Sequence, residues 1–183
     1  MKRTLLTAAS LALLALPASA AHAQIGFGVA GGPSFPMGDF KKAVDGGYHI
    51  TGIANLGIPL LPVGLRFEGS FSEFDYKSGL STTDAKARVI SGVANAILST
   101  PGILGPYLIG GIGVYNASAQ CSGCSSSDTK VGFNGGAGFK IGLAGLAVFA
   151  EARYHYVPGG TDATTAGTRS ATQFVPLSVG ITF

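Results

Sequence analysis

Hydrophobic residues alternate with small or polar residues along most of the chain after residue 24, which is the period of a β-strand and not of a helix. The alternation is clearest in residues 131–141, where Val131, Phe133 and Ile141 form one row and Asn134 and Lys140 belong to the other. Eight segments of this kind follow one another: 24–30, 48–56, 63–72, 86–98, 107–115, 131–141, 146–156 and 177–183. The pattern predicts an all-β protein.

The connections between these segments alternate in length. Short uncharged connections fall at 57–62, 99–105 and 143–145, and longer polar loops are expected at about 32–47, 73–85, 116–129 and 158–171. Short turns at one end and long loops at the other are typical of outer-membrane barrels. We therefore predict an eight-stranded antiparallel up-and-down transmembrane β-barrel.

The two rows of each strand indicate which face meets lipid. In the strands whose pattern is clear, the apolar row carries no charge, whereas Arg66, Glu68, Glu151 and Arg153 lie on the opposite row. A soluble barrel would place the apolar row inside, so the pattern favours a barrel with its apolar row in the membrane. The fourth and fifth segments are ambiguous, and in the fourth we place Ser91 and Asn95 inward.

The N-terminus has the features of a secretory signal peptide. Lys2 and Arg3 precede an apolar run over residues 5–16, which is shorter than the ~20 residues that a spanning helix needs. We place cleavage between Ala23 and Gln24, with a second small-x-small site at residues 18–20 as the alternative. The expected division is a signal peptide over 1–23 and a barrel domain over 24–183, with both chain ends in the periplasm.

Composition supports this interpretation. Charged residues make up 11% of the chain, against an average of about 25%, and glycine occurs 29 times. The formal charge is +3, and no basic stripe is present, so nucleic acid is not an expected partner.

Several stretches carry a family resemblance. Leu177, Val179, Ile181 and Phe183 form a C-terminal pattern of alternating apolar residues that ends in phenylalanine, and 107–115 and 149–154 look like barrel strands. The chain resembles the small eight-stranded outer-membrane barrels of bacteria, the group of the OmpA transmembrane domain, OmpX and the opacity proteins. The resemblance implies an outer-membrane location and insertion by the barrel assembly machinery. It implies no single activity, because such barrels serve as anchors, adhesins, narrow pores or enzymes.

The strongest candidate site lies inside the expected barrel. Arg66 and Glu68 belong to the third strand, and Glu151 and Arg153 belong to the seventh, which is opposite in a ring of eight. An eight-stranded barrel is only wide enough for side chains to fill, so we expect these charges to pair across the lumen as a plug. The alternative is a charged constriction that selects small solutes, and Lys140 is a candidate extension of the network.

Three other motifs are candidates for chemistry. Cys121 and Cys124 lie in a serine-rich segment, where export to an oxidising compartment favours a disulfide in a small loop. The glycines at 26, 28 and 31 match a dinucleotide fingerprint, but prolines follow where that motif needs a helix. His49 and His155 invite comparison with lipid-modifying barrel enzymes, but by strand parity His155 faces inward.

These observations predict a non-enzymatic surface barrel with a plugged lumen and four extracellular loops. A narrow passive channel is the first alternative and a lipid-modifying enzyme the second. We expect no cofactor, and we expect a monomer whose partners are outer-membrane lipid and, during insertion, the assembly machinery. The sequence leaves the partner of the surface loops open.

Overall fold

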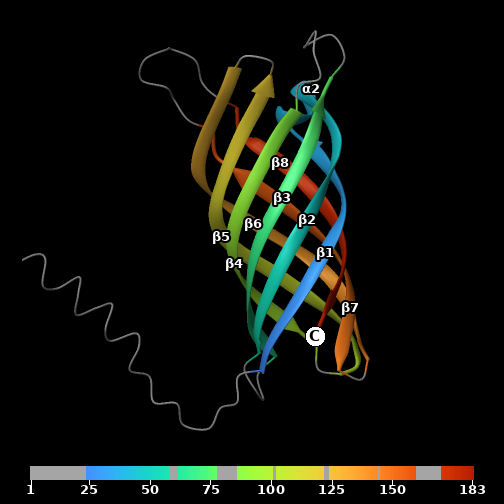
Figure 1. The fold of residues 1–183 in the computed structure, drawn as a ribbon. Coiled ribbons are helices and arrows are strands. Elements are labelled where there is room, and N and C mark those ends of the chain that lie inside the picture. The colour runs from blue at the N-terminus through green and yellow to red at the C-terminus, as the bar shows by residue number, and fades with distance from the viewer. Residues whose placement is uncertain are drawn as a thin grey trace, which may run out of the picture.

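The chain forms one closed antiparallel barrel in which each strand pairs with the next along the sequence and β8 pairs with β1 (Figure 1). The computed structural model describes residues 24–57, 62–77, 86–100, 102–121, 124–143, 145–159 and 170–183. The strands are β1 (Gln24–Met37), β2 (Val44–Gly57), β3 (Val63–Tyr76), β4 (Lys86–Ser99), β5 (Leu104–Cys121), β6 (Cys124–Leu143), β7 (Leu146–Val157) and β8 (Thr172–Thr182), with a short helix α2 (Phe40–Ala43) between β1 and β2. This confirms the predicted fold class.

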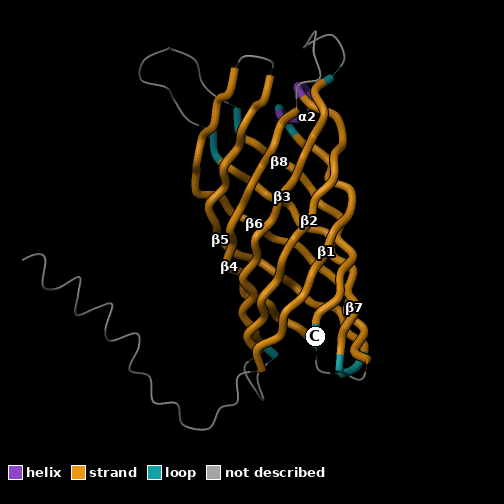
Figure 2. Tube along the Cα trace, viewed as in Figure 1, coloured by secondary structure: helices purple, strands orange, loops and turns teal. Residues whose placement is uncertain are grey.

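The first and last strands close the ring. Gly28 lies opposite Thr182 in the ladder, and Phe27 and Phe183 exchange two backbone hydrogen bonds of 2.8 Å each. Closure gives both edge strands a partner, so no open sheet edge is left between them. The tube view shows strands over nearly all of the described chain (Figure 2). No helix among the described residues is long and apolar enough to cross a membrane.

The two faces of the barrel wall differ as the alternation predicts. On β1 the apolar side chains point outward, and Ile25, Phe27 and Val29 are 54–62% exposed. The outer face carries exposed hydrophobic side chains on every strand, whereas most buried polar residues point into the lumen. A barrel with this arrangement is stable where its outer face meets hydrocarbon instead of water.

The structure resolves the two strands whose parity was ambiguous. Ser91 and Asn95 on β4 are buried and face inward, as predicted. On β5 the inward row contains Tyr107, Ile109 and Tyr115, all of them buried.

Three of the loops are shorter in the structure than the sequence predicts, because the flanking strands are longer. Strands β1 and β2 extend into the stretch 32–47, where only residues 38–43 separate them, and β3 continues to Tyr76. The stretch 116–129 is mostly a tall hairpin of β5 and β6 in which Cys121 lies opposite Cys124. Polar residues and prolines in these stretches resemble a loop, but a strand that rises beyond the apolar belt keeps its ladder without needing an apolar row.

Val44 and Phe74 in these extensions belong to a second part of the core. An apolar cluster fills the lumen at the end where α2 lies; its buried members are Val44, Phe74, Ala87, Val89, Val93, Tyr115, Val157 and Phe174. Phe40 of α2 packs against it, with its ring centroid 5.1 Å from that of Phe74. We call this the loop end of the barrel, and the opposite end, which holds both termini of the described chain, the turn end.

Candidate functional site in the barrel lumen

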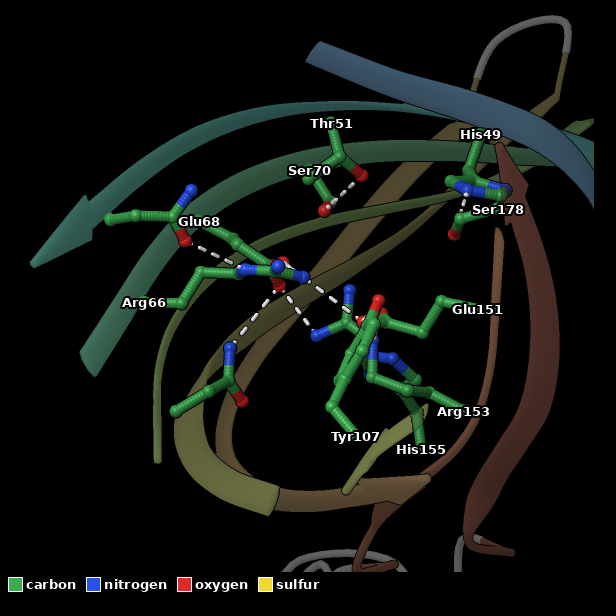
Figure 3. Close-up of polar contacts among 12 residues, drawn as sticks. His49, Thr51, Arg66, Glu68, Ser70, Tyr107, Glu151, Arg153, His155 and Ser178 are labelled. Carbon is green, nitrogen blue, oxygen red and sulfur yellow. Dashed lines mark hydrogen bonds and ion pairs between the residues drawn. The ribbon is translucent and has the colours of Figure 1, made fainter. Parts of the chain in front are cut away.

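The four charged residues expected to meet in the lumen are brought together by the structure. Arg66 and Glu68 come from β3, and Glu151 and Arg153 come from the opposite strand β7 (Figure 3). All four side chains are at most 7% exposed. Two positive and two negative charges at one depth make a group that is neutral as a whole.

The ion pairs cross the lumen and also run along each strand. Arg66 Nη1 donates to Glu151 Oε2 at 3.0 Å, and Arg153 Nη1 donates to Glu68 Oε2 at 2.5 Å. Arg153 Nε lies 2.5 Å from Glu151 Oε1, as an ion pair without hydrogen-bond geometry. Arg66 Nη1 and Glu68 Oε1 are 3.6 Å apart. Each charge therefore has an opposite charge nearby, which a buried ion needs because desolvation costs several kcal/mol per ion.

Neutral polar groups support the network. Tyr107 Oη donates to Glu151 Oε2 at 2.7 Å, and Asn95 Nδ2 donates to Glu68 Oε2 at 3.2 Å. Asn55 Oδ1 accepts from Arg66 Nε at 2.9 Å. These hydrogen bonds fix the carboxylates and the guanidinium in place, so the network joins strands β2, β3, β4, β5 and β7.

Aromatic side chains pack against Arg66 in the network. The Arg66 guanidinium carbon lies 5.0 Å from the ring centroid of Phe149 and 5.6 Å from that of Tyr107. The glycine-rich inward row of β6 makes room for these long side chains: a Cβ on Gly138 would collide with the Tyr107 ring, and one on Gly136 with Arg153. The glycines are required here by close approach and not by an unusual backbone conformation.

His49 is held by two serines on the loop side of the network. Its Nδ1 lies 3.1 Å from Ser34 Oγ and its Nε2 lies 2.9 Å from Ser178 Oγ. All three residues are buried, with at most 5% exposure. Both ring nitrogens are thus occupied by hydroxyl groups inside the barrel.

His155 belongs to the next layer toward the loop end. Its Nδ1 lies 2.9 Å from Tyr115 Oη, and its ring stacks on Phe174 with a centroid distance of 4.8 Å. The inward orientation predicted for His155 is what the structure has. No group of three or more potential metal ligands occurs among the residues that the structure describes.

Two other charged residues, Lys140 and Arg88, lie outside the network. Lys140 does not join it, because its Nζ instead donates to Ser99 Oγ at 3.2 Å at the turn end. Arg88 faces outward at the loop end, where Arg88 Nε and Lys86 Nζ pair with Glu73 at 2.7 and 2.5 Å. Arg88 therefore lies outside the lumen network.

The structure places most residues of the remaining sequence predictions, but two of these predictions stay untested. Cys121 and Cys124 pair in the backbone ladder, and the disulfide between them stays a prediction. Cleavage between Ala23 and Gln24 also stays a prediction, because residues 1–23 lie outside the described chain and β1 begins at Gln24. Leu177, Val179, Ile181 and Phe183 point outward on or just after β8 and are 42–67% exposed.

Sequence reasoning missed part of the lumen. It left Tyr107 unassigned because both rows of its strand are apolar, and it placed Ser34 in a loop. An inward tyrosine opposite the glycine at 138 is the kind of size complementarity that could have assigned the parity of β5.

Comparison with known proteins agrees with this architecture. Residues 6–183 match the model of the family described as "Outer membrane protein beta-barrel domain". Among solved structures, Neisserial surface protein A is 18% identical with a TM-score of 0.62, and the alignment covers 86% of this chain and 95% of that one. A major outer membrane protein from Thermus thermophilus is 14% identical with a TM-score of 0.55, covering 87% and 98%. OprG from Pseudomonas aeruginosa is 13% identical with a TM-score of 0.54, covering 89% and 98%. At such identities the likeness concerns the fold alone, and no functionally curated protein matches the sequence.

Proposed function

Because the chain belongs to the outer membrane protein beta-barrel domain family and resides in the bacterial outer membrane, we propose that it is a non-enzymatic surface barrel whose lumen is closed by its own side chains. In this proposal the wall anchors the protein in lipid, and the loop end of the barrel makes its external contacts.

The observation that carries the proposal is the four-charge network across the lumen. Its two cross-lumen ion pairs occupy the space that a solute would need, and each joins β3 to β7. A conducting pore needs an aqueous path, whereas these side chains are at most 7% exposed. The apolar cluster at the loop end lies in series with the network and adds a second closed layer.

The surroundings of the histidines support a role other than catalysis. A general base must reach the group from which it takes a proton, within hydrogen-bond distance or through one water molecule. The ring of His49 is held between two buried serine hydroxyls, and that of His155 lies between Tyr115 and Phe174. Neither ring faces the lipid, where a lipid substrate would lie.

A narrow channel is the second candidate, and one observation favours it. A chamber of about 700 Å³ enters the barrel from the turn end and reaches Arg66 and Tyr107. Solutes could therefore enter from one side as far as the network, and a rearrangement of the four charges would be needed to let them pass.

Planar-bilayer recordings of the purified protein test the proposal against this alternative. We expect little or no conductance from the unmodified barrel, because two filled layers lie in series. A steady, large conductance under the same conditions would make the channel the better function.

We further propose that the outward row at the C-terminus serves recognition during membrane insertion. Leu177, Val179, Ile181 and Phe183 present a continuous apolar edge next to the closing seam of β1 and β8. Removal of Phe183 is expected to reduce the heat-modifiable, folded fraction in outer-membrane preparations, whereas removal of the loop-end Lys41 side chain by Lys41→Ala should not. Equal folded fractions for the protein without Phe183 and for Lys41→Ala would contradict this role.

A further inference from the structure

The turn end of the lumen contains a chamber, lined by both polar and apolar residues, that the side chains of the charge network leave open. It has a volume of about 700 Å³, which is within the range of pockets that hold small molecules. Its polar lining consists of Asn55, Arg66, Ser99, Tyr107, Lys140 and Thr182. In bacterial outer-membrane barrels the short turns face the periplasm, so the chamber opens to the periplasmic side.

One positive charge in this chamber is not balanced by the network. Lys140 Nζ contacts the neutral hydroxyl of Ser99 at 3.2 Å, and none of the ion pairs among the described residues includes Lys140. The two arginines of the network already pair with its two glutamates.

Hydrogen-bond donors accompany the ammonium group. Asn55 uses its Oδ1 to accept from Arg66, which leaves its NH₂ group as a donor on the chamber side. Ser99 and Thr182 contribute hydroxyl groups. An ammonium ion with neutral donors around it, inside low-dielectric walls, attracts an anion.

We propose that this chamber binds the phosphate group of a ligand that enters from the periplasmic side, with Lys140 as its charged contact and Ser99 as a neutral one. Lysine binds phosphate as a point charge and does not require the paired geometry of arginine. The ligand ends at Arg66 and Tyr107, because the charge network closes the lumen beyond them. The site is therefore a blind pocket and does not depend on conduction.

Two classes of ligand carry a phosphate group that could reach the chamber. Soluble phosphomonoesters of the periplasm are one, and headgroups of the inner leaflet are the other, because apolar outward residues such as Leu56, Leu65 and Leu146 surround the same mouth. The chemistry of recognition is the same for both, so the experiment has one arm for each.

The first arm uses the full-length mature barrel, ¹⁵N-labelled, in maltoside micelles, which contain no phosphate. Titration with glycerol 3-phosphate should produce saturable amide shifts at Ser99, Tyr107 and Lys140. The second arm compares the same signals in micelles with and without added phosphatidylglycerol. Saturable shifts in the first arm assign a soluble ligand, and shifts confined to the second assign a lipid headgroup.

Matched variants connect the shifts to the chamber. Lys140→Gln should weaken the apparent affinity at least tenfold, and Lys140→Arg should retain most of it. Lys130→Gln removes the same charge from the opposite mouth, where Lys130 pairs with Asp128 at 3.0 Å, and should leave the affinity unchanged. Ser99→Ala is a second variant with a smaller loss, which keeps the test usable if Lys140→Gln folds poorly on a heat-modifiability gel. The proposal is overturned if neither arm gives saturable shifts, or if Lys140→Gln and Lys130→Gln bind equally well.

Discussion

The two halves of the lumen are filled by different chemistry. On the turn side, buried arginines and glutamates pair across the barrel and are held by Asn55, Asn95 and Tyr107. On the loop side the filling is mainly apolar, with Phe74 and Phe174 in edge contact at 5.7 Å and Phe40 of α2 above them. Hydrophobic packing tolerates imperfect geometry, whereas a buried charge requires its partner. The two halves should therefore respond differently to substitution.

Glu151→Ala should have the largest effect on stability. Glu151 accepts hydrogen bonds from Arg66 and Tyr107 and pairs with Arg153, so its removal leaves buried positive charge without compensation. Breaking a buried ion pair by removing one partner typically costs about 3–5 kcal/mol. Urea titration of the barrel in lipid vesicles measures this change in the free energy of unfolding.

Two comparisons show whether the loss comes from the network. Glu73→Ala also removes a buried carboxylate, but its partners Lys86 and Arg88 are 44% and 35% exposed and can be solvated, so it should cost less than Glu151→Ala. The double variant Arg66→Ala, Glu151→Ala should cost less than the sum of the two single variants, by about 0.5–3 kcal/mol for residues in direct contact. Strictly additive losses would show that the charges act independently.

Phe74→Ala tests the loop-side half. The Phe74 side chain is fully buried, and truncation of a buried phenylalanine costs about 3–5 kcal/mol through lost transfer energy and a cavity; partial filling by Phe40 should keep the loss near 3 kcal/mol. The same urea titration measures it.

Conductance measurements on variants test whether each half of the lumen is a barrier by itself. Glu151→Ala leaves the apolar cluster in place and Phe74→Ala leaves the charge network in place, so each single variant should conduct far less than the double variant. If Phe74→Ala alone conducts as well as the double variant, the network is no barrier and only the loop-side half closes the lumen.

The same contrast explains how much the sequence could predict. Within residues 63–71 and 146–156 every charged residue lies on the inward row, so a period of two assigns Arg66 and Glu151 to the lumen directly. On the loop side the inward row contains Val44, Phe74 and Phe174, and the alternation disappears. The sequence therefore predicted loops where the strands continue. Residue contacts such as that between Tyr107 and Glu151 depend on register and on the glycine row of β6, which no local pattern specifies.

The hairpin of β5 and β6 extends the loop side, and its tip is where we predict a disulfide. Cys121 and Cys124 are directly opposed in the ladder, which is compatible with the Cα separation of disulfides. For so small a loop, chain entropy gives a stabilisation of about 2 kcal/mol, less than either of the preceding effects. Alkylation of the exported protein followed by intact-mass analysis should find both thiols blocked unless reductant is added first. Two alkylated cysteines in the unreduced sample would refute the disulfide.

The smallest single effect is expected at His49, on the loop side of the network. Ser178→Ala removes one of the two hydroxyl partners of the imidazole, and Ser34→Ala removes the other. A typical hydrogen bond contributes about 0.5–1.5 kcal/mol, so each variant alone should lower the free energy of unfolding by roughly 1 kcal/mol.

The double variant is the informative one, because it leaves a buried imidazole without either hydroxyl. Each single variant leaves one ring nitrogen unsatisfied and the double variant leaves both, so the loss for the double variant should be at least the sum of the two single losses. This differs from the coupling expected for Arg66 and Glu151, where the second substitution removes a charge already left unpaired. Thr51→Val, which breaks a hydroxyl pair of 2.7 Å with Ser70 on neighbouring strands, is the control and should add linearly to Ser178→Ala. A less than additive loss for the serine pair would mean that water replaces the hydroxyls, and that the lumen is hydrated at the depth of His49 instead of being filled by side chains alone.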